Sequence, residues 1–181
     1  MRKLKITEMG RMNVEEFRAS KKMPLIVVLD DVRSMYNVGS VFRTADAFRV
    51  EAIYLCGITA QPPHPEIHKT ALGAEDTVEW KHFPTALDAV ACLKEKGYII
   101  YSIEQCAEST MLNELDLLTL NAQSAGYAII LGNEVKGVHQ EVVDASDDCI
   151  EIPQFGTKHS LNVSTTAGMV IWEFAKLMMI H

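Results

Sequence analysis

Ile150-Glu151-Ile152-Pro153 reads as a short strand, and Ser160-Leu161-Asn162 stands just beyond it at the head of a long apolar segment. A proline ends such a strand because it cannot donate to the hydrogen-bond ladder of a sheet. The small polar side chains stand where a helix begins, and a helix N-terminus leaves backbone N–H groups without partners. This order is typical of a ligand site at the carboxyl end of a strand in an α/β sheet. Ser160 alone is equally well explained as the N-cap of the helix.

Strand-like and helix-like segments alternate along the rest of the chain, which predicts an α/β fold with a mostly parallel sheet and helices on both faces. The expected strands are Leu25–Asp30, Ala52–Cys56, Tyr98–Ile103, Tyr127–Leu131 and Cys149–Ile152. The expected helices are one from Asn13 through Ala19, one capped by Asn37, one opened by Pro65 and closed by Gly73, and the segments Ala86–Lys96, Val138–Ala145 and Leu161–Met179. Residues 107–124 are ambiguous, and we expect a loop with a helical turn there.

The composition is that of a globular protein. At 181 residues, with 48% hydrophobic and 23% charged residues, the chain suits one domain with a sizeable core. Glu173 and Lys176 interrupt the apolar C-terminal segment, which argues against a membrane span. The N-terminus has no continuous apolar stretch, so we expect no secretory signal. The four cysteines, Cys56, Cys92, Cys106 and Cys149, form no C-x-x-C pair and lie far apart in sequence, which favours reduced thiols and a cytoplasmic protein.

The charge is unevenly distributed. The net charge is −7, but residues 1–22 hold seven basic and three acidic side chains, a net +4, and the remainder therefore carries −11. Pro24 follows this segment, so we expect a basic N-terminal extension at residues 1–23 and one domain at residues 24–181. The extension suggests either an arm that binds RNA phosphates or a solvated helix that keeps the protein in solution, and composition does not decide between them.

Two further segments contain polar residues at fixed spacing. They are Asn37-Val38-Gly39-Ser40-Val41-Phe42-Arg43 and Leu131-Gly132-Asn133-Glu134-Val135-Lys136-Gly137. The second matches neither G-x-G-x-x-G nor a P-loop, because Val138 stands where a P-loop needs Ser or Thr. Alone it would be a tight strand–helix turn that uses glycine for its backbone freedom. Alone, Arg43 would form a weak surface salt bridge with Asp46.

Together the three segments resemble the motifs of the SpoU, or TrmH-like, RNA 2′-O-methyltransferases, a branch of the SPOUT superfamily. The resemblance runs from about Leu25 to the C-terminus, in the right order, with no key position substituted. It implies transfer of a methyl group from S-adenosylmethionine to a ribose 2′-hydroxyl in RNA. It also implies that the C-terminal third, roughly residues 127–179, forms a trefoil knot, a rare exception to unknotted connectivity.

The resemblance implies a cofactor site. It places Leu131, Gly132, Ile152 and Leu161 around the adenosine of S-adenosylmethionine. Aliphatic walls and backbone groups can hold an adenine without a charged residue. Glu134 is either a cap for turn amides or a residue of the cofactor pocket, and we favour a positioning role.

The resemblance also implies that Arg43 is catalytic. A guanidinium keeps its proton at ordinary pH, so we expect Arg43 to grip the RNA phosphate bidentately and to stabilise the developing alkoxide rather than to act as a base. Asn37 and Asn162 are expected to orient ribose or phosphate, and Ser160 to bind the nucleotide or the methionine carboxylate.

We expect no metal, because His64 and His68 are spaced i, i+4 without a third ligand, and His82, His139 and His159 belong to no constellation. The Leu161–Met179 helix is apolar nearly all round, and in the family it takes part in a homodimer whose two active sites draw on both subunits.

The RNA target is expected to be tRNA rather than rRNA, since Pro62–Trp80 resembles relatives that act on tRNA and no long separate RNA-binding domain is present. Two alternatives are a SPOUT protein that methylates a base and a catalytically idle RNA-binding module. The second is disfavoured because Asn37, Arg43, Ser160 and Asn162 are all present.

Overall fold

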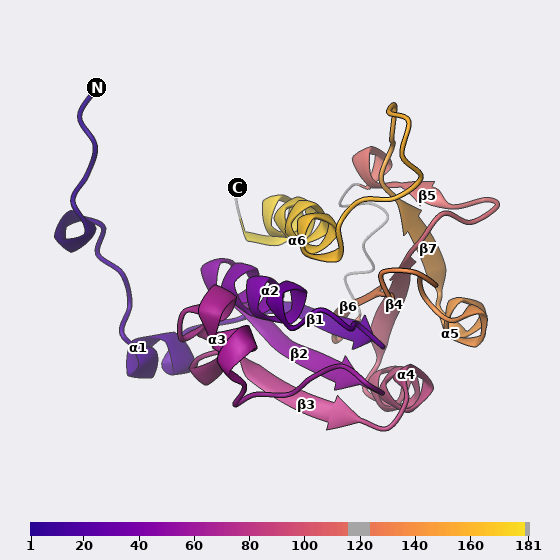
Figure 1. Cartoon of the computed structure of the whole chain (residues 1–181), viewed down its shortest axis with the longest axis horizontal. Coiled ribbons are helices and arrows are strands. Elements are labelled where there is room, and N and C mark those ends of the chain that lie inside the picture. The colour runs from indigo at the N-terminus through magenta and orange to yellow at the C-terminus, as the bar shows by residue number, and fades with distance from the viewer. Residues whose placement is uncertain (116–123, 180–181) are drawn as a thin grey trace.

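A computed structural model describes residues 1–115 and 124–179. Within them, seven parallel strands form one sheet in the order β3-β2-β1-β6-β4-β7-β5 (Figure 1). The strands are β1 Met23–Asp30, β2 Val50–Cys56, β3 Glu79–Phe83, β4 Tyr98–Ile103, β5 Thr110–Met111, β6 Gly126–Leu131 and β7 Asp148–Glu151. The expected parallel α/β fold is confirmed. The sequence patterns did not reveal β3, whose side chains are not buried, or β5, which has only two residues.

Helices cover both faces of the sheet, as predicted (Figure 1). They are α1 Val14–Ala19, α2 Met35–Ala47, α3 Pro65–Ala71, α4 Ala86–Glu95, α5 Gln140–Ala145 and α6 Val163–Met179. Short 3-10 turns lie at Ile6–Glu8, Ala74–Asp76 and Leu112–Glu114. The α2, α3 and α6 helices pack in one core, and α4 and α5 pack in the other. The helical turn expected within residues 107–124 is the one at Leu112–Glu114, while residues 116–123 lie outside the described part of the chain.

The central strand β1 separates the two cores. Leu25, Val27 and Leu29 face α2 and α6, whereas Ile26 and Val28 face α4, and none is more than 2% exposed. Successive side chains of a strand point to opposite faces, so an unbroken apolar run is what a strand covered on both sides requires. The carboxyl ends of β1 and β6 are thereby fixed side by side.

The start of α2 differs from the prediction. Asn37 was expected to be the N-cap, but the helix begins at Met35 and Ser34 is the cap, with its side chain accepting from the Asn37 backbone N–H at 3.3 Å. Serine caps as well as asparagine does, and the Asn37 side chain is left for a tertiary contact. The predicted apolar stripe of Val38, Val41, Phe42 and Ala45 is confirmed, since all four are fully buried.

Gly39 lets α2 and α3 approach closely. A Cβ on Gly39 would lie 2.2 Å from both the carbonyl oxygen of Ile67 and Oγ1 of Thr70. No side chain fits at that distance. The glycine of the Asn-x-Gly-x-x-x-Arg segment therefore serves the packing of two helices.

The start of α6 also differs from the prediction. Ser160 is not the N-cap, because the helix begins at Val163 and the Asn162 side-chain oxygen accepts from the N–H groups of Ser164 at 2.9 Å and Thr165 at 3.3 Å. The buried face of α6 consists of Val163, Ala167, Val170, Ile171, Phe174 and Ala175. Met169 and Trp172 remain 42% and 45% exposed, so the helix is not covered all round.

The N-terminal extension is partly anchored. The predicted cap of α1 is confirmed as a capping box between Asn13 and Glu16. Phe17 is buried in the core, and the Arg18 guanidinium donates to the Asp76 carbonyl at 2.7 Å. The residues before α1 run away from the body of the protein (Figure 1). At the other end of the anchored part, Met23 already belongs to β1, one residue before the expected boundary.

The α3 helix opens with Pro65 as predicted, and Leu72 rather than Gly73 is the residue that ends it, in a left-handed conformation. None of the helices in the described residues is long and apolar enough to cross a membrane.

Candidate functional site

The loop 132–137 follows β6 and is held together by one side chain, Asn133. Its amide donates to the Asp31 carbonyl at 2.8 Å, and its side-chain oxygen accepts from the N–H groups of Val135 and Lys136 at 2.9 and 3.1 Å. The backbone N–H and C=O of Asn133 also pair with those of Gly137. The loop is therefore a compact unit fastened to the end of β1.

The glycines at the two ends of this loop have different roles. A Cβ on Gly132 would lie 2.0 Å from the Gly137 carbonyl carbon, so the two ends of the loop meet without room for a side chain. Gly137 has a φ of +71°, the left-handed region that favours glycine. A side chain at Gly132 would meet the loop backbone, so this glycine is required for the closure of the loop.

Glu134 is the hub of the site. Its carboxylate accepts from the backbone N–H groups of Arg33 at 3.0 Å and Ser34 at 2.9 Å, and from the Asn37 amide at 3.0 Å. Partial burial opposes ionisation, but the hydrogen bonds from Arg33 and Ser34 outweigh it and lower the pKa of Glu134. The carboxylate thus fixes the loop after β6 against the first turn of α2.

The chain of hydrogen bonds continues from Asn37 to Asn162. The Asn162 amide donates to the Asn37 side-chain oxygen at 3.1 Å, while the Asn162 oxygen caps α6. Asn37 is only 8% exposed. The three sequence motifs thus meet in one relay, Glu134–Asn37–Asn162. The two asparagines use their side-chain amides within the protein, an arrangement that positions the surrounding loops.

A cavity of about 870 Å³ lies beside this relay. It brings together five residues predicted to bind the cofactor, namely Leu131, Gly132, Glu134, Ile152 and Leu161. Ser160, predicted to bind the nucleotide or the methionine carboxylate, also lines it. The aliphatic walls come from the end of β6 and from the segment after β7. Asn37, Asn162 and Arg43 do not line the cavity.

Arg43 lies on the exposed side of α2. Within residues 1–115 and 124–179, its guanidinium has no hydrogen bond or ion pair, and the salt bridge considered with Asp46 does not form. Asp46 instead accepts from the Thr77 hydroxyl at 2.7 Å. Arg43 is a solvent-facing cation that the described residues do not neutralise.

Sequence reasoning missed Glu104 and Gln105, which also line the cavity. The Glu104 carboxylate accepts from the N–H groups of Val138 at 3.1 Å and Gln105 at 3.0 Å. The available signal was position alone, since both residues directly follow a predicted strand, and ligand sites in such sheets lie beyond the carboxyl ends of strands.

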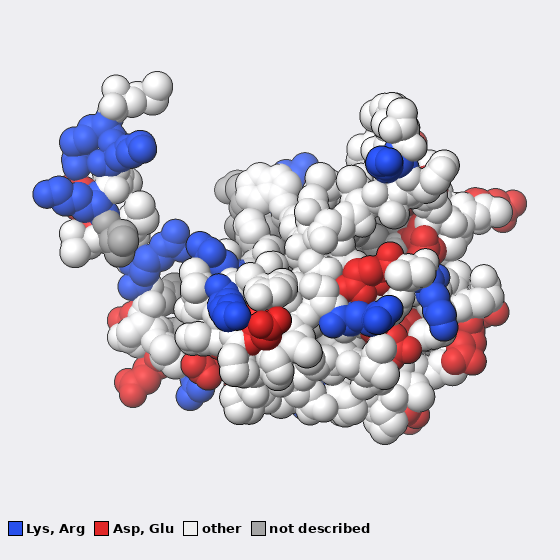
Figure 2. All heavy atoms as spheres, in the orientation of Figure 1, with Lys and Arg blue, Asp and Glu red and all other residues white. Residues whose placement is uncertain are grey.

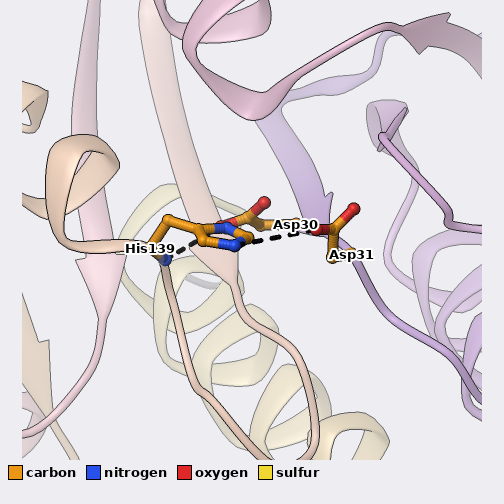
Figure 3. Close-up of side chains that lie close together, drawn as sticks. All are labelled: Asp30, Asp31 and His139. Carbon is orange, nitrogen blue, oxygen red and sulfur yellow. Dashed lines mark hydrogen bonds and ion pairs between the residues drawn. The ribbon is translucent and has the colours of Figure 1, made fainter.

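His139 was assigned to no constellation, and this was wrong. Oδ2 of the buried Asp30 accepts from the backbone N–H of His139 at 3.0 Å and pairs with its Nδ1 at 2.9 Å (Figure 3). Asp31 lies 3.7 Å from Nε2. Asp30 raises the pKa of His139 by hydrogen bonding and by its charge. The pair ties the start of α5 to the end of β1.

Asp30, Asp31 and His139 are the one group in the described residues whose ligand atoms gather within 4.8 Å as a cation would require. In this structure Asp30 and His139 use these atoms for the hydrogen bond between them. His64 and His68 have other partners: His64 accepts from the Glu66 N–H at 3.2 Å, and His68 pairs with Glu75 at 2.5 Å.

Comparison with known proteins places this architecture among RNA-modifying enzymes. The model of the SpoU rRNA Methylase family matches residues 24–172. A 23S rRNA (guanosine-2′-O-)-methyltransferase of Neisseria meningitidis is 33% identical over 150 residues, which cover 83% of this chain and 57% of that protein.

Two solved structures share the fold. The A. aeolicus TrmH/SpoU tRNA modifying enzyme has a TM-score of 0.77 at 25% identity, covering 91% of this chain and 80% of that chain. An AdoMet-bound rRNA methyltransferase from Sinorhizobium meliloti has a TM-score of 0.72 at 25% identity, and the match covers 88% of this chain and 59% of that chain. The chain thus spans a little more than half the length of these two rRNA-modifying relatives.

The pKa of His139 predicts a pH dependence of stability. Because that pKa is raised in the folded protein, the stabilisation is complete below the unfolded value of about 6.5 and is lost as pH rises through the folded value. His139→Gln should remove the stabilisation that protonated His139 contributes. The difference in unfolding free energy between the parent and the variant should therefore shrink as the pH is raised above about 6.5. Urea titrations from acidic to alkaline pH measure it. His82→Gln, whose ring nitrogen lies 3.1 Å from the Gly57 carbonyl oxygen, is the control. A constant difference for His139→Gln would contradict the assignment.

The relay predicts energetic coupling between Asn37 and Asn162. Replacing both by alanine should cost less than the sum of the single changes, with an interaction energy of about 0.5–1.5 kcal/mol, because either change alone already breaks their shared bond. Urea unfolding of the four proteins in the cycle measures this energy. Pairing Asn162→Ala with Gly156→Ala, at a position open to solvent, should give additive effects. Additivity in the asparagine cycle would show that the bond contributes nothing.

Proposed function

Because the chain belongs to the SpoU rRNA methylase family, we propose that it is an RNA methyltransferase that moves a methyl group from S-adenosylmethionine to a ribose 2′-hydroxyl. The observation that carries this proposal is the relay of Glu134, Asn37 and Asn162, which joins all three motifs beside one cavity. A fold kept for packing alone does not require polar residues from three separated segments to meet at the carboxyl edge of the sheet.

The cavity suits S-adenosylmethionine by its chemistry. Leu131, Ile152 and Leu161 offer aliphatic walls for an adenine, and the loop 132–137 offers backbone groups. The carboxylates of Glu104 and Glu151 also line it and complement a positively charged ligand. When bound, the cofactor supplies an electrophilic methyl group on a sulfonium sulfur, so the protein's main task is alignment and no metal is needed.

Arg43 is proposed to act on the RNA. Its exposed guanidinium is free to form a bidentate contact with a phosphate, and it can stabilise the alkoxide that develops at the 2′-oxygen. Asn37 and Asn162 contribute by holding the loops, and Ser160, at the cavity wall, contacts the nucleotide or the methionine carboxylate. Since Arg43 lies outside the cavity wall, we propose that a second copy of the chain brings its Arg43 to this cavity.

A homodimer is therefore part of the proposal. Exposed apolar side chains supply a surface for it: Met169 and Trp172 on α6, and Phe155, which is 98% exposed, in the segment before α6. The Trp172 ring packs edge-on against Phe48 at the end of α2, with ring centroids 5.8 Å apart. This surface therefore adjoins the helix that carries Arg43.

The preferred substrate in this proposal is tRNA. Supporting it, the TM-score is 0.77 with the A. aeolicus tRNA modifying enzyme and 0.72 with the Sinorhizobium meliloti rRNA methyltransferase. Methylation of a base, and RNA binding without catalysis, remain the competing outcomes. A cytoplasmic location is proposed with the RNA substrate.

The trefoil knot is likewise proposed, over roughly residues 127–179. Its support is the course of the chain: β6 inserts between β1 and β4, β7 lies beyond β4, and α6 then returns to contact β1 and α2. Such a return past strands already placed is what a knotted path needs.

The function is tested by incubating the protein with S-adenosylmethionine that carries a labelled methyl group and with either tRNA or 23S rRNA. Alkaline digestion of the RNA then shows whether the labelled methyl group is on a ribose or on a base. A 2′-O-methyl group makes the following phosphodiester resistant, whereas a methylated base leaves it labile. Arg43→Ala should lower turnover about 100-fold or more, and Arg43→Lys should also be poor because an ammonium lacks the planar fork. Calorimetry with the cofactor, in the presence of a chelator, should give equal affinity for parent and variants. Turnover near the parent's in Arg43→Lys would sink the bidentate role.

The dimer is tested by sedimentation, which should give about twice 20.2 kDa. Trp172→Glu should produce monomers, since a charge cannot be buried without a partner, and methyl transfer should fall with it. Ile58→Glu, at an apolar side chain elsewhere that is 66% exposed against 45% for Trp172, should stay dimeric. An active monomer would overturn the shared site.

Lys and Arg side chains gather on the N-terminal extension, at the upper left of Figure 2. Whether this basic extension binds RNA is tested by the salt dependence of RNA binding. Deletion of residues 1–22 is a poor test because Phe17 is part of the core. Replacing Lys3, Lys5 and Arg11 by glutamine should lower the logarithmic salt slope by about 0.7–0.9 for each RNA phosphate that the arm then fails to neutralise. In the matched control, Lys81, Lys94 and Lys96 are replaced by glutamine, so that the net charge changes by the same amount. Equal slopes in both variants would leave the arm without an RNA-binding role.

A further inference from the structure

Two cysteines that lie far apart in sequence come together in the wall of the cavity. The Cys106 thiol donates to the Cys149 sulfur, with the two sulfur atoms 2.9 Å apart. Cys149 is on β7, opposite Ser102 of β4, and Cys106 is in the segment that leaves β4. Sequence spacing gave no sign of this pair. A disulfide needs a sulfur–sulfur distance of about 2.05 Å, so the sulfurs must approach by only about 0.9 Å.

The two thiols differ in exposure. Cys149 is 8% exposed, and burial raises the pKa of its thiol, so a peroxide in solution reacts with it more slowly than with the more accessible Cys106. Cys106 is half-buried and faces the cavity, so a small solute can reach it. The other two cysteines have no thiol at bonding distance in the described residues, and one of them, Cys56, is fully buried.

We propose that Cys106 and Cys149 are a modification site, at which a peroxide converts the two thiols into a reversible disulfide in the cavity wall. The Cys106 sulfur attacks one peroxide oxygen, the O–O bond breaks, and a sulfenic acid and water form. The Cys149 sulfur then attacks the Cys106 sulfur, the S–O bond breaks, and the Cys149 thiol proton passes to the leaving hydroxide, which departs as a second water. Both cysteine sulfurs are oxidised by one electron each, and hydrogen peroxide is reduced to two waters. A dithiol reverses the reaction by exchange.

The position of the pair links its oxidation to the contents of the cavity. Cys106 and its neighbour Gln105 both line the cavity, and the Gln105 amide donates to the His159 carbonyl at 3.1 Å. The segment that carries Cys106 is thereby joined to the segment that carries Ser160. A ligand in the cavity covers Cys106 and slows its oxidation. This part of the inference rests on the proposed function, whereas the formation of the disulfide does not.

The disulfide is tested on the purified full chain with hydrogen peroxide, followed by alkylation, proteolysis and mass spectrometry. The expected product is one cross-linked pair of peptides containing Cys106 and Cys149, lighter by two hydrogens and restored by dithiothreitol. The oxidised protein should melt higher by about 5–10 °C, since the bond closes a long loop. Cys92→Ser should give the same cross-link, and Cys149→Ser should instead carry Cys106 to sulfinic acid. The proposal would be overturned if Cys106 became a sulfinic acid as fast in the parent as in Cys149→Ser. Cross-links through Cys56 or Cys92 would overturn it as well.

The link to the cavity is tested by repeating the oxidation with S-adenosylhomocysteine at saturation, its binding being verified by calorimetry. The cross-link should form about 10-fold more slowly, because the cavity is filled. An unchanged rate with the ligand bound would overturn the link and leave the disulfide in place. If S-adenosylhomocysteine does not bind at all, the proposed function fails, and the cross-link in the free protein still decides whether the modification site exists.

Discussion

The site depends on one carboxylate that orders two amides. Glu134 can only accept hydrogen bonds, so the Asn37 amide must turn its NH₂ group toward it. The Asn37 oxygen then faces Asn162, whose own NH₂ group is used there, and the Asn162 oxygen is left for the first turn of α6. None of these bonds lies within a single helix or strand. A single ionised group therefore sets the relative position of the loop after β6, the start of α2 and the start of α6.

The sheet makes this meeting possible. Because β1 and β6 are parallel neighbours, the loop after β6 lies beside the segment that follows β1, and Asn133 and His139 are both fastened to the end of β1. The full burial of β1 on both faces fixes that end, and the polar groups are added at the point where the apolar run stops. The buried core thus makes the end of β1 rigid, and the hydrogen bonds beyond it fix the positions of the surrounding loops.

Hydrophobic periodicity was enough to predict β1, the buried stripe of α2 and the alternation of strands and helices, because burial leaves a repeating pattern in sequence. It could not show β3, which has little burial to leave a pattern, or the choice of Ser34 over Asn37 as a cap. That choice follows from a tertiary bond between Asn37 and a distant glutamate, and such bonds have no period. The motif resemblance named six residues that line one cavity, but the partners of His139 and the packing role of Gly132 are products of the folded geometry alone.

The relay has a consequence for communication across the protein. One end, Glu134, lines the cavity, and the other, Asn162, caps a helix whose outer face carries Met169 and Trp172. A ligand that moves the Glu134 carboxylate toward itself weakens the hydrogen bonds that connect Glu134 through Asn37 to that helix. Conversely, a contact on the outer face of α6 that restricts the motion of the helix also restricts the motion of Glu134. Thermodynamic reciprocity requires the two effects to be equal in free energy, so the binding of a ligand in the cavity and the binding of any partner to the outer face of α6 would be linked equilibria rather than independent events.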